Sequence, residues 1–173
     1  MEWRKPGEAQ PRKTKVTQSA KIMAMIFWDC RGIFLTDFKE RNIIVNAAYF
    51  TSLLHKLRDT IKDKRRGMLG RGVRLLHDNA PVHMVAVAKA AVTECGFDEI
   101  EHSPYSPDLA PSDCYPFSKL KKDLRGKKFD DEVKRAVMDH FADKEPEHFL
   151  KGIELLVHKC EKCVEIKGDY TEK

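Results

Sequence analysis

The sequence predicts a single α/β domain, and three observations support that fold class. Short apolar segments of strand length alternate along the chain with longer segments in which apolar residues recur at helical spacing. The length of 173 residues suits one ordinary domain. The 42% hydrophobic and 34% charged residues provide a core and a well-solvated surface, which excludes a fibre and a disordered tail.

The N-terminal segment differs from the rest of the chain in composition. Residues 1–20 are rich in proline, lysine and arginine and show no hydrophobic period, so we interpret them as a basic arm and residues 21–173 as the domain. Such an arm is either a solvated extended segment or a strap onto DNA or a partner subunit. The net charge of +5 permits a polyanionic partner, but many unrelated soluble proteins share it.

The first predicted elements form a hairpin. Residues 21–28 are apolar on both faces, as expected of a strand buried in the middle of a sheet. Arg31 and Gly32 indicate a turn, and residues 33–38 predict the second strand.

The next element is an amphipathic helix over residues 47–66, with Asn46 as its N-cap. Its apolar stripe consists of Phe50, Leu53, Leu54, Leu57 and Ile61. The later elements, in chain order, are a short buried strand at 73–77, a helix at 82–95 that stops at Gly96, a strand at 97–102, and helices at 131–143 and 147–163. The last two helices carry the stripes Val133/Ala136/Val137/Phe141 and Phe149/Leu150/Ile153/Leu156/Val157.

The cysteines point to a reducing compartment. The chain has five cysteines at irregular spacings, its polar N-terminus lacks a signal-peptide pattern, and the apolar run 22–28 is too short to cross a membrane. We therefore expect an intracellular protein without a membrane partner. Cys160 and Cys163 invite a zinc interpretation, but a closed zinc site needs four ligands and the sequence shows no second pair at the required spacing. Helical packing is the better account of this pair.

Two acidic residues occupy positions that suit metal chemistry. Asp78 follows a predicted strand, and Asp113 opens a predicted helix 34 intervening residues later (113 − 78 − 1). That interval holds a helix, a strand and a loop, which is enough chain to bring the two carboxylates together. Paired carboxylates suit Mg²⁺, and two such ions can activate an attacking water or 3′-hydroxyl and stabilise the leaving oxygen. Alternatively, Asp78 is a turn residue and Asp113 favours a helix N-terminus.

Two motifs strengthen the metal interpretation. The segment 77–83, HDNAPVH, resembles the HDNA-x-P-H block of mariner-family transposases, and segment 105–113, YSPDLAPSD, matches that family's corresponding block at every position. The interval between the two motifs also resembles the family's. Weaker similarities to the family occur along the whole chain. They lie in FWD (27–29) with GI (32–33), in VNA (45–47) with Tyr49, in GKKF (126–129) and in KCVEIKGDY (162–170).

The resemblance implies an RNase H-like fold, a mixed sheet flanked by helices. It also implies a protein that cuts and rejoins DNA by two-metal phosphoryl transfer. It implies that Asp78 and Asp113 are the second and third metal-binding and catalytic carboxylates, with Mg²⁺ or Mn²⁺ as cofactor. Asn79 and His83 would be near-site residues without an assigned role, and Asp108 would order the signature loop. The implied partners are DNA, as transposon ends and a TA target, and a second transposase subunit, in the nucleus. The DNA-binding residues stay unassigned.

The chain departs from the family pattern at the first acidic residue. In the family this residue lies in a T-G-D-E-x-W block well upstream of the WWD-like strand, and no such block occurs in this sequence. Asp29 has its own family counterpart and is not a substitute, and neither Glu2 nor Glu8 fits. The resemblance therefore implies a sheet that lacks its first, central strand, with exposed edges that favour pairing with another chain. The family's N-terminal helix-turn-helix units are also absent, so DNA contacts would be weaker and salt-dependent.

Smaller departures suit a relic copy. Val82 replaces the usual proline, Pro116 stands where an aliphatic residue is usual, and Cys160 replaces a tryptophan that would anchor the core.

Three hypotheses about function follow from the sequence. The leading one is a truncated transposase that is unlikely to complete strand cleavage alone. The others are a non-catalytic module that binds DNA or a full-length transposase, and one piece of a longer active protein.

Overall fold

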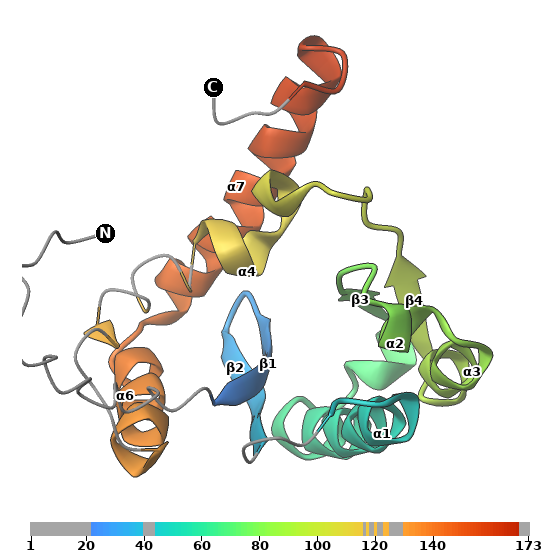
Figure 1. The fold of residues 1–173 in the computed structure, drawn as a ribbon, viewed down its shortest axis with the longest axis vertical. Helices are drawn as coiled ribbons and strands as arrows, with labels where there is room; N and C mark the ends of the chain where they lie inside the picture. The colour runs from blue at the N-terminus through green and yellow to red at the C-terminus, as the bar shows by residue number, and fades with distance from the viewer. Residues whose placement is uncertain are drawn as a thin grey trace, which may run out of the picture.

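The computed structural model describes residues 22–39, 44–115, 117, 120, 123–124 and 130–169, without the side chains of residues 113, 114 and 130. The predicted arm at 1–20 and Pro116 lie outside these residues. The described elements are β1 (Met23–Asp29), β2 (Gly32–Lys39), α1 (Ala47–Lys64), η1 (Leu69–Arg71), β3 (Val73–Leu76), α2 (Pro81–Met84), α3 (Ala86–Glu94), β4 (Phe97–Ile100), η2 (Pro107–Leu109), α4 (Pro111–Cys114), α6 (Asp130–Ala142) and α7 (Pro146–Glu165). Strands and helices thus share one chain, as the α/β prediction requires (Figure 1).

The predicted hairpin is confirmed. β1 and β2 pair antiparallel, from Met23 opposite Lys39 to Asp29 opposite Gly32. The Asp29 carboxylate accepts a 2.8 Å hydrogen bond from the backbone N–H of Arg31, which closes the turn. Gly32 adopts a φ of +134°, a conformation that other residues rarely reach.

The expectation that the first strand lies in the middle of a sheet is wrong for the described residues. These form two separate two-stranded sheets, β1–β2 and the parallel pair β3–β4. β1 pairs with β2 alone, and no residue of β1 is fully buried. The physical reason is that a strand is covered along both edges only when it has a neighbour on each side, and β1 has a described neighbour on one side only.

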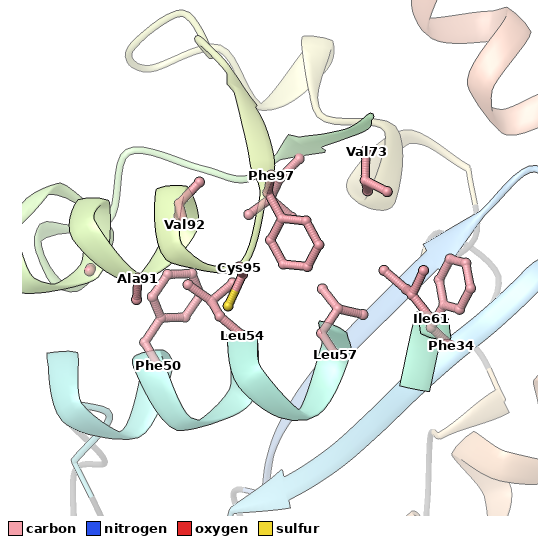
Figure 2. Packing of buried hydrophobic residues seen from close by; sticks show 12 residues of the cluster. Phe34, Phe50, Leu54, Leu57, Ile61, Val73, Ala91, Val92, Cys95 and Phe97 are labelled. Carbon is pink, nitrogen blue, oxygen red and sulfur yellow. The ribbon is translucent and has the colours of Figure 1, made fainter. Parts of the chain in front are cut away.

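The predicted helix at 47–66 is confirmed as α1. The Asn46 side chain accepts a 2.9 Å hydrogen bond from the backbone N–H of Tyr49, so it caps the helix as expected. The buried residues of α1 are the five predicted ones, Phe50, Leu53, Leu54, Leu57 and Ile61. Figure 2 shows this face of α1 packed beneath α3 and β4, with Phe50, Leu54 and Leu57 directed toward Ala91, Val92, Cys95 and Phe97.

The hairpin separates two hydrophobic clusters. The larger cluster joins α1, α3, β3 and β4, and Met25 and Phe27 of β1 pack against it. The smaller cluster consists of Leu120, Val137, Phe141 and Phe149, and Ile26 and Trp28 pack against that one. Alternate residues of a strand point to opposite faces. The apolar character of β1 on both faces is therefore explained by a cluster on each side.

Three other expectations need correction. The helix predicted at 82–95 is two helices, because Val85 is extended (φ −74°, ψ 149°) and serves as the N-cap of α3. β3 buries Val73 and leaves Arg74 exposed, so only one of its faces is covered.

The α7 stripe is also only partly buried. Phe149 is buried, whereas Leu150, Val157 and Cys160 are exposed, so helical packing does not account for Cys160. Figure 1 shows the reason, since the carboxyl-terminal part of α7 extends past the other elements. Among the described helices, none is long and apolar enough to cross a membrane.

Candidate active site

Asp78 lies immediately beyond the carboxyl end of β3, where two histidines hold it. Its backbone carbonyl accepts hydrogen bonds from Nδ1 of His77 at 2.9 Å and of His83 at 3.1 Å. Nδ1 of His83 also lies 2.8 Å from Oδ1 of the Asp78 carboxylate. Both groups facing Nδ1 of His83 are acceptors, so this nitrogen carries a proton. The backbone N–H of Ala80 donates to the same Oδ1 at 3.2 Å.

His83 is itself held by packing. Its ring is 9% exposed and lies tilted over the ring of Phe50, at 4.1 Å between centroids. The ring of His77 meets it edge-on at 4.8 Å. Phe50 belongs to the buried stripe of α1, so the core orients the histidine, and the histidine orients the exposed carboxylate of Asp78.

Asn79 connects two loops beside Asp78. Its side-chain Nδ2 donates a 2.6 Å hydrogen bond to the backbone carbonyl of His102. Asn79 follows β3 and His102 follows β4. The carboxyl ends of two adjacent parallel strands are thereby tied together beside Asp78.

The two motifs meet at a cavity of about 260 Å³. Asp78, His77 and His83 line one side, and Ala110, Pro111 and Ser112 line another. The remaining lining residues are Ala24, Met25, Ile26, Phe27, Phe50, Leu76 and His102. Since Ser112 directly precedes Asp113, the start of α4 borders the same cavity as Asp78. The Asp113 side chain lies outside the described part of the structure.

The hairpin strand β1 and the helix α7 hold α4 in place. The indole Nε1 of Trp28, on β1, donates a 3.1 Å hydrogen bond to the Ser112 hydroxyl. Gly152 of α7 packs beside Trp28 and Tyr115, so closely that a Cβ at this position would lie 3.2 Å from Trp28 and 3.1 Å from Tyr115. The hairpin and α7 thus fix the helix turn that carries Asp113.

The structure separates Asp108 and Asp29 from this cavity, since neither lines it. Asp108 is buried in η2, and its backbone carbonyl accepts a 3.1 Å hydrogen bond from Nζ of Lys159. This bond runs to the backbone of Asp108, and a role of its side chain in ordering the signature loop stays a prediction. Asp29 bonds to its own turn and faces Nε of Arg65 at 3.7 Å.

Asp78 supplies the one carboxylate among the described residues that line the cavity. The Asp78 side chain is 69% exposed, and no described residue bonds to its Oδ2. A carboxylate oxygen is the ligand that Mg²⁺ and Mn²⁺ prefer. Among the described side chains, no group of three or more His, Cys, Asp or Glu residues is placed to hold a metal. Within that part of the chain, Asp78 is therefore the ligand candidate.

Sequence reasoning missed several residues of the site. Phe50 and His102 come from separate segments that no local pattern connects, whereas Trp28 and Ser112 lie in the family-like segments 27–29 and 105–113 without having been singled out. His77 carried a usable signal, because it stands next to Asp78 in the first motif.

The chain is similar to known transposases in sequence and in structure. The family model "Transposase (partial DDE domain)" matches residues 1–71. The Mariner Mos1 transposase of Drosophila mauritiana is 33% identical over 156 residues, which are 88% of this chain and 45% of that protein. The human histone-lysine N-methyltransferase SETMAR is 25% identical over 175 residues, which are 99% of this chain and 26% of that protein. The chain thus spans less than half the length of either relative.

The chain covers a larger share of the solved structures of Mos1. The catalytic domain of Mos1 transposase, solved with raltegravir and Mn, superposes with a TM-score of 0.84 at 33% identity, over 88% of this chain and 78% of that one. A pre-cleavage Mos1 transpososome gives a TM-score of 0.85 at 30% identity, over 99% of this chain and 52% of that one. This match confirms the RNase H-like fold class. The chain belongs to the mariner family of transposases and corresponds to a part of their catalytic domain.

Proposed function

We propose that this chain is a portion of the machinery for metal-dependent DNA cleavage and strand transfer. One observation carries the proposal. Asp78, held by His83 at the end of β3, and the helix turn that bears Asp113 border the same cavity. Support comes from the Mos1 relatives, whose catalytic domain has been solved with Mn and with Mg, and whose assemblies include a paired-end complex with the left transposon end.

In this proposal Asp78 and Asp113 bind Mg²⁺ or Mn²⁺ through carboxylate oxygens. The bound ion supplies activation of a water or 3′-hydroxyl and stabilisation of the leaving oxygen at a phosphodiester. The protein's own contribution is orientation. His83 holds Oδ1 of Asp78 and leaves Oδ2 toward solvent, and the bond from Trp28 to Ser112 holds the start of α4. Asn79 acts indirectly, by tying the two strand-end loops together.

The substrate class is DNA, as transposon ends and a TA-containing target, and the protein works in the nucleus with a second transposase subunit. Two of the family's three carboxylates have counterparts in this sequence, so we propose that the chain by itself does not complete cleavage.

Metal binding tests this assignment directly. Titration of the purified chain with Mn²⁺, followed by electron paramagnetic resonance, is expected to show a weak site that Asp78→Asn and Asp113→Asn each abolish. Asp98→Asn, an exposed carboxylate on β4 that does not line the cavity, is the matched control and should bind Mn²⁺ as the parent chain does. Equal binding by all three variants would contradict the assignment.

Among the described residues each sheet has only two strands, and its unpaired edges favour a second candidate function, a non-catalytic module that binds DNA or a full-length transposase. Co-purification of the chain with intact transposase would support this function. A chain that remains monomeric and shifts no DNA at low salt would contradict it. Efficient nicking of transposon-end DNA by the chain alone, lost in Asp78→Ala, would favour the catalytic function instead.

A further inference from the structure

We propose that two adjoining hollows around the carboxyl end of α1 bind the phosphate backbone of duplex DNA. This contact lies away from the carboxylate of Asp78, so it holds a part of the DNA that is not being cut. The inference rests on the proposed action on DNA, and it adds a surface that the chemistry at Asp78 does not use.

The two hollows meet where α1 ends, and they have volumes of about 570 Å³ and 500 Å³. Arg65 and Arg66 line both of them, so together they form one surface, called here the basic face. Two carboxylates, Asp29 and Asp63, belong to this lining. Its cationic side chains are Arg31, Lys62, Lys64, Arg65, Arg66 and Arg71.

Most of the excess positive charge of the chain lies on the basic face. Its six cations and two carboxylates leave +4 (6 − 2), whereas the whole chain carries +5. The carboxyl end of a helix attracts cations, but its dipole corresponds to only about half an elementary charge. Lys62 and Lys64, in the last turn of α1, already satisfy that attraction. The basic face therefore holds more positive charge than the helix needs.

Four of the cations are available to a ligand. Arg31, Lys62, Arg66 and Arg71 are exposed, and no described carboxylate forms an ion pair with any of them. Arg71 donates through Nε to the backbone carbonyl of Gly67 at 3.4 Å. This bond fixes one edge of the guanidinium and leaves its two terminal nitrogens for an acceptor, the arrangement that suits a phosphate.

The other two cations are held within the fold. Nζ of Lys64 donates a 2.9 Å hydrogen bond to the backbone carbonyl of Phe34, and the guanidinium of Arg65 lies 5.4 Å from the centre of the Phe34 ring. Nε of Arg65 faces the Asp29 carboxylate at 3.7 Å, and that carboxylate also accepts from the backbone N–H of Arg31. Asp29 is thus neutralised locally and does not repel an anion on the basic face.

The lining identifies the phosphate backbone as the part of the DNA that is bound. Single-stranded nucleic acid is held by stacking of its bases on aromatic rings, and no aromatic residue is among the described lining residues of either hollow. A lipid surface takes up exposed apolar side chains, but Met68 and Leu69 in this lining are half-buried. Cations on an open surface position a duplex through its phosphates without reading its sequence.

The basic face is remote from Asp78. Phe50 lines the cavity that contains Asp78, and Lys64, 14 residues later in the same helix (64 − 50), lines the basic face. At 1.5 Å per residue this span is about 21 Å. β3 spans the same separation, because Gly72 precedes it and Asp78 follows it. The phosphates bound at the basic face are therefore not those that an ion at Asp78 would contact.

Fluorescence anisotropy with a labelled duplex that lacks transposon-end sequence tests the proposal. Without divalent metal, the logarithm of the affinity should fall linearly with the logarithm of salt concentration, by about 0.9 for each phosphate contact. The triple variant Arg31→Gln, Arg66→Gln, Arg71→Gln is expected to reduce this slope by about 2–3. It should also weaken binding at least about tenfold near 0.1 M salt. A second duplex of unrelated sequence should give the same two results.

A matched control separates this surface from net charge. The triple variant Lys89→Gln, Arg135→Gln, Lys151→Gln removes the same charge from exposed positions on α3, α6 and α7 that line neither hollow. It is expected to bind the duplex with the affinity and salt slope of the parent chain. Any contribution of residues 1–20 is common to both triple variants.

Lysine acetylation locates the contact. Bound duplex should protect Lys62 from acetylation and leave Lys151 as reactive as in the free chain. Polyglutamate of equal charge should compete with the duplex at least about tenfold more weakly than unlabelled duplex does. Equal competition by polyglutamate would instead indicate an acidic protein as the partner, and would overturn the proposal.

Three other results would also overturn it: no duplex binding at low salt, an unprotected Lys62, or equal weakening by the two triple variants. The Mn²⁺ titration described above keeps this surface separate from the metal site. A chain that binds Mn²⁺ as expected and fails the duplex tests refutes the basic face alone. A chain that passes the duplex tests and binds no Mn²⁺ refutes the metal site alone.

Discussion

Two substitutions of His83 can distinguish its role in positioning the Asp78 carboxylate from its role in packing. Its Nδ1 donates toward Asp78, while its ring packs on Phe50. Leucine at this position keeps a buried apolar side chain and removes the donor. Asparagine keeps a side-chain N–H near the place of Nδ1 and removes the ring. The two substitutions therefore remove different halves of the same residue.

The expected change in Mn²⁺ affinity follows from the exposure of the hydrogen bond between His83 and Asp78. A hydrogen bond to a charged group contributes about 1.5–3 kcal/mol. Because the Asp78 side chain is 69% exposed, water replaces part of the bond, and we take the lower end of that range. A loss of about 1.4 kcal/mol corresponds to about tenfold in a binding constant. His83→Leu is thus expected to weaken Mn²⁺ binding about tenfold and, because the same bond is a contact of the folded state, to lower the free energy of unfolding by about 1.5 kcal/mol at most.

His83→Asn should instead retain Mn²⁺ binding and lose stability. Loss of the ring leaves a space beside Phe50 that is expected to lower the free energy of unfolding by about 1–3 kcal/mol. Mn²⁺ affinity should stay within about threefold, or roughly 0.6 kcal/mol, of the parent chain. Isothermal titration with Mn²⁺ and urea unfolding of both variants measure the two quantities. Parent-like Mn²⁺ binding by His83→Leu, or equal loss of Mn²⁺ affinity in both variants, would refute the positioning role.

Three further predictions concern the scaffold. Leu54→Ala removes a fully buried side chain of the larger cluster and should lower the free energy of unfolding by about 2–5 kcal/mol, measured by urea titration, whereas the exposed Leu150→Ala should change it by less than about 1 kcal/mol. Gly152→Ala places a Cβ against Trp28 and Tyr115 and should lower stability by about 1 kcal/mol despite the better helix propensity of alanine, with a raised melting temperature as the contradicting result. Burial, followed by its hydrogen bond to Asp37, raises the pKa of Tyr49 above 10.0, so stability should fall as pH rises past 10, and Tyr49→Phe should reduce that slope in urea titrations at pH 9 to 11. An unchanged slope would contradict the last prediction.

The elements that the sequence predicted best are those determined by local pattern. The stripe of α1 and its Asn46 cap repeat at fixed spacing within one helix, so the amphipathic period identified every buried residue of that helix. The hairpin of β1 and β2 depends on a nearby turn and was equally accessible. The position of Asp78 at a strand end followed from a short apolar run before it.

Features that depend on distant neighbours could not be predicted. β1 has the composition of a central strand, yet its burial depends on a strand beside it, which its own sequence does not encode. Cys160 lies on the correct helix at the correct period, but α7 extends beyond the elements that would cover it. The contact of His83 with Asp78 depends on the single helix turn α2, which ends at Met84 where a continuous helix was predicted.

We expect Asp78 and the start of α4 to share one divalent metal site. Fe²⁺ bound in place of Mg²⁺ reacts with added hydrogen peroxide, with ascorbate to reduce the Fe³⁺ formed, and generates hydroxyl radicals that cut the backbone near the ion. Mass spectrometry identifies the cut positions. A shared site should give cuts in two segments, at residues 77–80 and 110–114, that excess Mg²⁺ suppresses together. Cuts in only one of these segments, or cuts that Mg²⁺ does not suppress, would contradict it.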